Sequence, residues 1–149
     1  MTQSLIQAAK DQVAALTQAA YEKAAKAGAL PGGVAVDATV EIPKDVRNGD
    51  YASTFAMVGA KAFHMAPRVI AQIMAENMDL TGTYFNKVEV AGPGFLNFTL
   101  GSKWMGAVLS SIEEQGENYG RCDVGKGQKF MVEFVSANPT GPMHMGNAR

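Results

Sequence analysis

The chain has 149 residues, with 13 basic and 14 acidic side chains and a formal net charge of -1. This balance argues against a strongly basic nucleic-acid binder, and 47% hydrophobic with 18% charged residues is typical of a globular chain. The single cysteine, Cys122, excludes an internal disulfide framework, and with only His64 and His144 besides it argues against a closed zinc site.

The chain also lacks the signals of export or membrane insertion. The N-terminal residues show no basic segment followed by an apolar block, and no stretch approaches the roughly 20 apolar residues of a bilayer span. We therefore expect a cytoplasmic location and no membrane contact.

The first predicted element is an amphipathic helix that begins after Ser4, the expected N-cap, and stops before Gly28. Its apolar residues recur at spacings of three and four: Leu5, Ala9, Val13, Leu16 and Ala20. From Val34 to Ile42 the apolar period changes to two, which predicts a half-buried strand. Asn48-Gly49-Asp50 is turn chemistry, and we expect Asp50 to cap the helix that follows.

Helical stripes follow over 55–63 and from Pro67, which suits the first turn of a helix. Two extended runs, Phe85 to Ala91 and Phe95 to Leu100, flank Gly92-Pro93-Gly94 and predict a hairpin. A further helix is expected from Ser102 to Gly116. Residues 117–128 resemble a linker, and the nearly continuous apolar run over 129–135 predicts a strand buried on both faces of a parallel sheet.

The predicted fold class is therefore α+β: a small, mainly antiparallel sheet packed by helices, followed by the first strand of a separate α/β domain. We expect one domain over 1–100, a connecting helix and linker over 101–128, and the start of a truncated second domain over 129–149.

The segment that carries chemistry follows the last predicted strand. There a Pro/Gly-rich loop leads into His144-Met-Gly146-Asn147. A strand, a tight loop and a helix start are the arrangement in which a helix N-terminus binds phosphate. Gly146 permits close approach of a nucleotide, and the side chains of His144 and Asn147 can donate hydrogen bonds.

Three segments, in order, resemble one family. Ser136-Ala-Asn-Pro-Thr-Gly-Pro-Met-His-Met-Gly-Asn-Ala-Arg149 is similar to the first signature region of arginyl-tRNA synthetases, which are class I synthetases with a His-Ile-Gly-His motif. Gly49-Asp-Tyr-Ala-Ser-Thr-Phe-Ala resembles a helix-opening segment of the family's N-terminal domain, and Val88-Glu-Val-Ala-Gly-Pro-Gly-Phe-Leu-Asn-Phe98 resembles that domain's closing hairpin.

The resemblance implies an enzyme that activates L-arginine with ATP and Mg²⁺ and transfers the arginyl group to an arginine-specific tRNA. It implies that residues 1–100 are the N-terminal additional domain and that 129–149 open a Rossmann-type catalytic domain. A full-length protein would be the ligase and is expected to be a monomer, whereas we expect the 149-residue chain to contact tRNA without catalysis.

The resemblance also assigns site residues. His144 and Asn147 are the expected catalytic residues. Together with Gly146 they would also bind ATP, whereas Ser136 and Asn138 would bind arginine. Asn147 stands where the family usually has a second histidine. The whole signature region is Ala137, Asn138, Pro139, Thr140, Gly141, Pro142, Met143, His144, Met145, Gly146 and Asn147.

The family's N-terminal domain is similar to a module that touches the dihydrouridine loop of tRNA. RNA loops are read by stacking and by hydrogen bonds to base edges, so exposed aromatic or amide side chains near turns are the candidates. These are Asn48, Tyr51, Tyr84 and Asn86.

Two other interpretations remain open at this stage. The chain could be a free-standing, non-enzymatic RNA-binding or interaction module whose C-terminal motif has lost its function. It could also belong to another nucleotidyltransferase of the same superfamily, although the residues that lead into His144 argue against this.

Overall fold

The computed structural model describes residues 4–121, 125–133 and 141. The chain divides into two compact units, Met1–Gln115 and Gly116–Arg149, and each is described by itself. The first unit contains every strand found in the described part of the chain.

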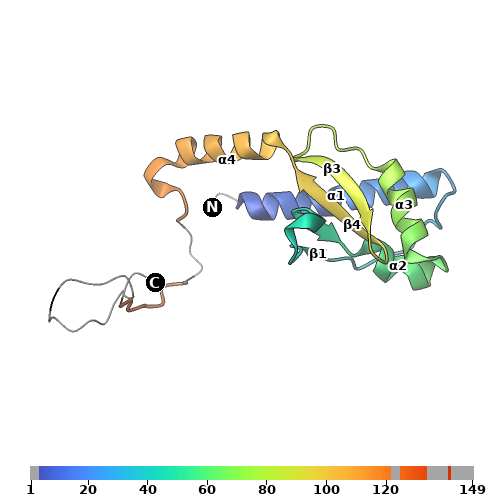
Figure 1. Cartoon of the computed structure of the whole chain (residues 1–149), viewed down its shortest axis with the longest axis horizontal. Helices are drawn as coiled ribbons and strands as arrows, with labels where there is room; N and C mark the ends of the chain where they lie inside the picture. The colour runs from blue at the N-terminus through green and yellow to red at the C-terminus, as the bar shows by residue number, and fades with distance from the viewer. Residues whose placement is uncertain (1–3, 122–124, 134–140, 142–149) are drawn as a thin grey trace. The chain divides into compact units, whose positions relative to one another are not determined.

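Its sheet has four antiparallel strands in the order β1-β2-β4-β3 (Figure 1). The strands are β1 (Val40–Glu41), β2 (Tyr51–Ser53), β3 (Phe85–Ala91) and β4 (Phe95–Leu100). The helices are α1 (Leu5–Lys26), α2 (Phe55–Phe63), α3 (Pro67–Asn77) and α4 (Ser102–Gln115), with a 3-10 turn η1 (Val46–Asn48). This architecture confirms the predicted α+β class with a small antiparallel sheet.

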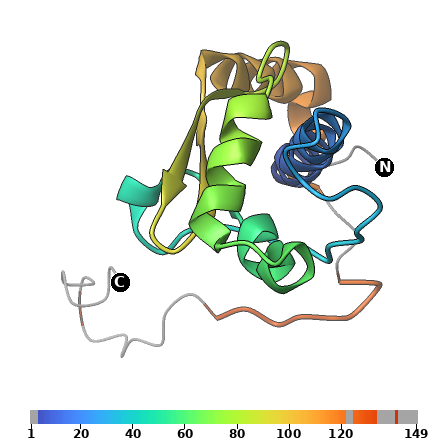
Figure 2. The ribbon, with the colours of Figure 1, turned by 90° about the vertical axis from the view of Figure 1, so that its right-hand side faces the viewer.

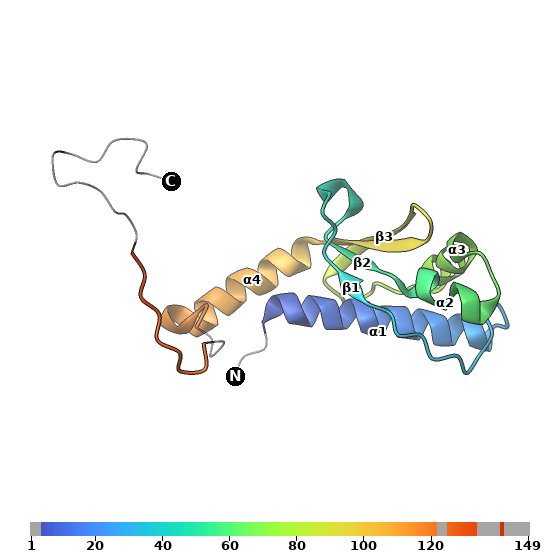
Figure 3. The ribbon, with the colours of Figure 1, turned by 90° about the horizontal axis from the view of Figure 1, so that it is seen from below.

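Helices α1, α2 and α3 cover one face of the sheet, as Figures 2 and 3 show from two directions. The strands turn Leu96 and Phe98 of β4 to that face, where both are fully buried. They meet Val13 of α1 and Ile70 and Met74 of α3, which are also fully buried. Because strand side chains alternate between faces, the neighbours of Leu96 and Phe98 point to the face without these helices.

The helix boundaries confirm most of the sequence predictions. Gly28 follows α1 with a φ of 73°, the left-handed conformation that commonly ends a helix. Pro67 is the first residue of α3, and α4 ends directly before Gly116. Ser4 lies at the N-cap of α1, but its side chain makes no capping hydrogen bond.

The strand predicted over 34–42 is wrong in extent. Burial alternates as predicted, since Val34, Val36, Ala38 and Val40 are half-buried and the residues between them are exposed. Only Val40–Glu41 pair with another strand, however. The preceding residues pack their apolar side chains on the core without a strand beside them, and Ile42 is 60% exposed.

The expectation that Asp50 caps a helix is also wrong. The Leu100 N–H donates to Oδ2 of Asp50 at 2.8 Å, so this carboxylate caps the end of β4 instead. The reason is strand β2, which the sequence did not reveal: it begins at Tyr51 and places Asp50 beside β4.

Helix α4 forms as predicted, but none of its residues is buried. Trp104 packs edge-on against Tyr84, with 5.3 Å between ring centroids, while Met105 and Leu109 are more than 60% exposed. No helix among the described residues is both long enough and apolar enough to cross a membrane.

In the second unit the described residues form only the 3-10 turn η2 (Gly116–Asn118). The strand predicted over 129–135 stays a prediction. Residues 129–133 belong to no strand and pair with none in the described part of the chain, and Phe130, Met131 and Val132 are at least 68% exposed. Residues 134 and 135 lie outside the described residues.

Candidate nucleic-acid interface

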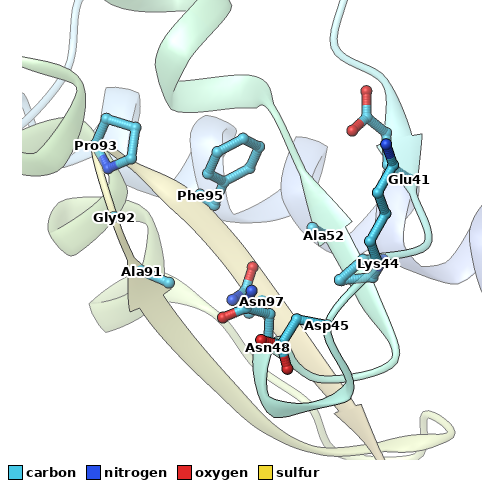
Figure 4. Close-up of a pocket in the computed structure, with 11 residues that line it drawn as sticks. Glu41, Lys44, Asp45, Asn48, Ala52, Ala91, Gly92, Pro93, Phe95 and Asn97 are labelled. Atoms are coloured by element: carbon cyan, nitrogen blue, oxygen red, sulfur yellow. The ribbon is translucent and has the colours of Figure 1, made fainter.

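The face of the sheet opposite α1, α2 and α3 carries a groove of about 400 Å³ (Figure 4). This volume lies in the range of roughly 300–1,000 Å³ that is common for small-molecule sites. The groove is lined by Glu41, Pro43, Lys44, Asp45, Asn48, Ala52, Ala91, Gly92, Pro93, Phe95 and Asn97. Its walls therefore come from β1, η1 and the β3–β4 hairpin, with β2 and β4 between them.

The strand register explains why there is a hollow. Glu41 pairs with Ala52, and Ala52 pairs with Asn97, so these three side chains form a row across the face. Ala91 and Phe95 form the next pair along the hairpin. Because Ala52 and Ala91 have only methyl side chains, they leave a space on this face of the sheet, and the ring of Phe95 lies beside that space (Figure 4).

Asn97 is the polar group at the base of the groove. The residue is only 8% exposed, and its amide makes no hydrogen bond within the described part of the chain. No side-chain oxygen or nitrogen described there is both fully buried and unpartnered. The Asn97 amide is therefore open to the groove, where its carbonyl can accept and its NH₂ can donate.

A second amide, that of Asn48, reaches the groove because of a close backbone approach at Gly49. Gly49 has a φ of 80°, and a Cβ atom there would lie 2.7 Å from the carbonyl oxygen of Phe98. The Asp50 N–H donates to that same oxygen at 2.8 Å. These contacts fix the turn of η1 against β4, and Asn48 with it.

Charges at the rim nearly cancel. Arg47 donates to Asp45 through Nη2 at 2.7 Å and through Nε, and the Arg47 backbone N–H donates to Asp45 Oδ1 at 3.0 Å. The side-chain hydrogen bonds, and after them the backbone one, hold the pKa of Asp45 below its ordinary value, and the side-chain hydrogen bonds raise the pKa of Arg47. Besides Asp45, the charged residues that line the groove are Lys44 and Glu41, and within the described part of the chain Lys44 forms no ion pair.

This arrangement suits one unpaired base. A base can stack on an aromatic face such as that of Phe95, while amides such as those of Asn97 and Asn48 bond to its edge. The near-neutral rim fits recognition by stacking and hydrogen bonds, with few phosphate contacts.

The residues proposed from the sequence as RNA contacts are only partly brought together. Asn48 lines the groove, but Tyr84 and Asn86 do not. Tyr51 is 4% exposed and packs edge-on against Phe85, so the expectation that it is an exposed aromatic is wrong. Residue 51 points to the helical face because its neighbour Ala52 points to the groove. Burial, and to a lesser extent the charge of Asp50, raises the pKa of Tyr51.

Sequence reasoning missed Phe95 and Asn97 as candidate site residues. The available signal was their spacing: an aromatic and an amide two residues apart in a strand share a face, and that face is opposite the buried Leu96 and Phe98. Only the position of the helices decides that this face is open.

The expected catalytic and substrate residues Ser136, Asn138, His144, Gly146 and Asn147 lie outside the described residues. So does the rest of the signature region, apart from Gly141, which is exposed. No group of three or more histidine, cysteine, aspartate or glutamate side chains suited to a metal ion occurs in the portion that the structure describes.

The fold and groove define a small α+β domain with a groove of about 400 Å³ on its open sheet face. The chain belongs to the arginyl-tRNA synthetase family: the family profile described as "Arginyl tRNA synthetase N terminal domain" matches residues 4–100.

Individual relatives agree. The chain is 47% identical over 146 residues to the arginine–tRNA ligase of Acetivibrio thermocellus, and 49% identical over 147 residues to that of Caldanaerobacter subterraneus. These alignments cover 98% and 99% of this chain but 26% of each relative, so the chain spans about a quarter of their length.

The crystal structure of arginyl-tRNA synthetase from Plasmodium falciparum has a similar fold, with a TM-score of 0.57 at 17% identity. The match covers 73% of this chain and 18% of that one.

Proposed function

We propose that this chain is the tRNA-contacting N-terminal part of an arginine–tRNA ligase and that its groove takes one unpaired base of the tRNA dihydrouridine loop. The observation that carries the proposal is the open amide of Asn97 beside the ring of Phe95. Family membership supplies tRNA as the nucleic acid, and the dihydrouridine loop offers unpaired bases of the kind that such a groove can receive.

The groove residues have distinct roles in this proposal. Phe95 provides the stacking surface, whereas Asn97 and Asn48 recognise the base edge. Lys44 lies where it can reach the phosphate next to that base. Binding would then depend weakly on salt, because few phosphates are neutralised.

The test is a binding titration of the 149-residue chain with an arginine tRNA transcript. Phe95→Ala should weaken binding by about 1–3 kcal/mol, the range for loss of one base stack. Asn97→Ala should also weaken binding, while Gln72→Ala is the matched control, since Gln72 is an exposed amide on α3 and lies outside the groove.

The RNA provides the second arm of this test. A transcript whose dihydrouridine loop is replaced by an unrelated loop should bind the wild-type chain as weakly as the intact transcript binds Phe95→Ala. Equal affinity of wild type and Phe95→Ala for the intact tRNA contradicts the proposal.

The activity of a full-length protein is part of the same proposal. It would join L-arginine to tRNA in the cytoplasm, as a monomer, and would consume ATP bound with Mg²⁺. His144 and Asn147 would lie at the ATP phosphates, Gly146 under the adenine nucleotide, and Ser136 and Asn138 at arginine. The phosphate charge would be stabilised electrostatically by His144 and Asn147. The 149-residue chain alone would not form arginyl-adenylate, which arginine-dependent exchange of pyrophosphate into ATP can test.

A free-standing interaction module is not favoured. The similarity to arginine–tRNA ligases covers 98–99% of the chain and so includes the segment after residue 128.

A further inference from the structure

The turn of the β3–β4 hairpin forms the wall of the groove beside the proposed stacking surface. Ala91, Gly92 and Pro93 line the groove together with Phe95, and the turn is closed by a hydrogen bond from the Gly94 N–H to the Ala91 carbonyl at 3.2 Å. Phe95 directly follows this turn, so any contact that holds the turn in place also sets the position of Phe95.

The turn rests on the first residues of α3. Gly94 is buried and has a φ of 145°. A Cβ atom on Gly94 would lie 2.8 Å from both the carbonyl carbon and the Cβ of Pro67, and 2.9 Å from the Pro67 oxygen. Two of these three atoms are backbone, so no side-chain rotation can relieve the contact.

Arg68, the next residue of α3, also contacts this turn. Its Nη1 donates to the carbonyl oxygen of Gly92 at 3.3 Å. Pro67 is the first residue of a helix whose core residues Ile70 and Met74 are fully buried, so the start of α3 is a fixed support.

We propose that Pro67 and Arg68 are positioning residues for RNA recognition: they hold the hairpin turn, through Gly94 and Gly92, so that the ring of Phe95 is set for stacking before the base arrives. This inference rests on the proposed function. It adds that the start of α3, on the helical side of the sheet, determines affinity without touching the RNA.

The experiment combines Gly94→Ala with Phe95→Ala in the 149-residue chain and measures affinity for the arginine tRNA transcript. Gly94→Ala should weaken binding about tenfold, and in the Phe95→Ala background its additional effect should fall to about twofold or less, because both changes act through one ring. Far-UV circular dichroism and thermal unfolding of each variant establish that it is folded.

Gly82→Ala, in the turn before β3 and outside the groove, is the control. Gly82 also has a positive φ, of 81°, and no atom lies within 4 Å of the Cβ that it would gain. This variant should leave the affinity within about twofold of the wild type, since left-handed backbone strain away from the hairpin does not displace Phe95.

Arg68→Ala keeps the test decisive if Gly94→Ala does not fold. This variant should weaken binding about threefold without changing the slope of affinity against salt, whereas loss of a phosphate contact would lower that slope by about one.

The outcomes separate the two proposals. If Phe95→Ala has no effect on binding, the proposed function fails. If Phe95→Ala weakens binding, any of three results overturns the positioning proposal. The first is wild-type affinity in both Gly94→Ala and Arg68→Ala. The second is a full effect of Gly94→Ala in the Phe95→Ala background, and the third is a lower slope of affinity against salt in Arg68→Ala.

Discussion

His64 ends α2 in the left-handed region, with a φ of 54°, where glycine is the usual residue. Its side chain is exposed, so no buried contact offsets the strain on its Cβ. His64→Gly should therefore raise the free energy of unfolding by about 0.5–1 kcal/mol, as measured by urea denaturation. His64→Ala, which keeps the Cβ, should leave stability nearly unchanged; a glycine variant no more stable than the alanine variant would contradict this explanation.

The ion pair at the groove rim gives a second prediction for single residues. Hydrogen bonds from Arg47 lower the pKa of the Asp45 carboxyl below its ordinary 3.8 in the folded chain. Because the folded pKa is the lower one, the contribution of this pair to stability is present above pH 3.8 and is lost as the pH falls through the folded value. Carbon-detected NMR titration should find this low pKa in the wild type, and Arg47→Gln should return it toward 3.8; an unchanged pKa in the variant would exclude Arg47 as the cause.

At the scale of elements, α2 and α4 contain glycines in opposite environments. A Cβ on Gly59 of α2 would lie 2.6 Å from Cε2 of Phe63, whose ring packs in the core against Tyr21 and Phe55. Gly59→Ala should thus destabilise the chain by about 1–3 kcal/mol through overpacking, despite the better helix propensity of alanine. In α4, no atom lies within 4 Å of a Cβ on Gly106.

Gly106→Ala is the matched control, and helix propensity alone should stabilise it by about 0.5–1 kcal/mol. The two variants therefore have opposite expected signs in the same urea denaturation. If both stabilise the chain, the ring of Phe63 yields to the added methyl group and α2 is less tightly packed than its contacts indicate.

At the scale of the whole molecule, the buried core described by the structure belongs to the first unit. Its members lie between Ala9 and Phe98, and Trp104 is the last residue packed against it. We expect a chain of residues 1–115 to unfold cooperatively with the same Tm and the same denaturant midpoint as the 149-residue chain. Calorimetry of both chains tests this, and a clear drop in Tm on removal of 116–149 would show that the second unit stabilises the first.

Local sequence patterns determined most of the elements. The three- and four-residue spacing from Leu5 predicted α1, Pro67 marked the start of α3, and Gly92-Pro93-Gly94 between two alternating runs predicted the hairpin with the bounds that β3 and β4 have. These features depend on backbone sterics and side-chain periodicity within a few residues, which a sequence contains in full.

Tertiary structure alone decided the pairing of β2 and the location of the groove. Tyr51–Ser53 becomes a strand because its partner Leu96–Phe98 lies beside it, more than 40 residues later in the chain, and a three-residue run has no periodicity that would reveal it. The same pairing buries Tyr51 and turns Ala52 and Asn97 outward. Which face of a strand is open depends on where the helices pack, and that is set by the burial of apolar surface across the whole unit.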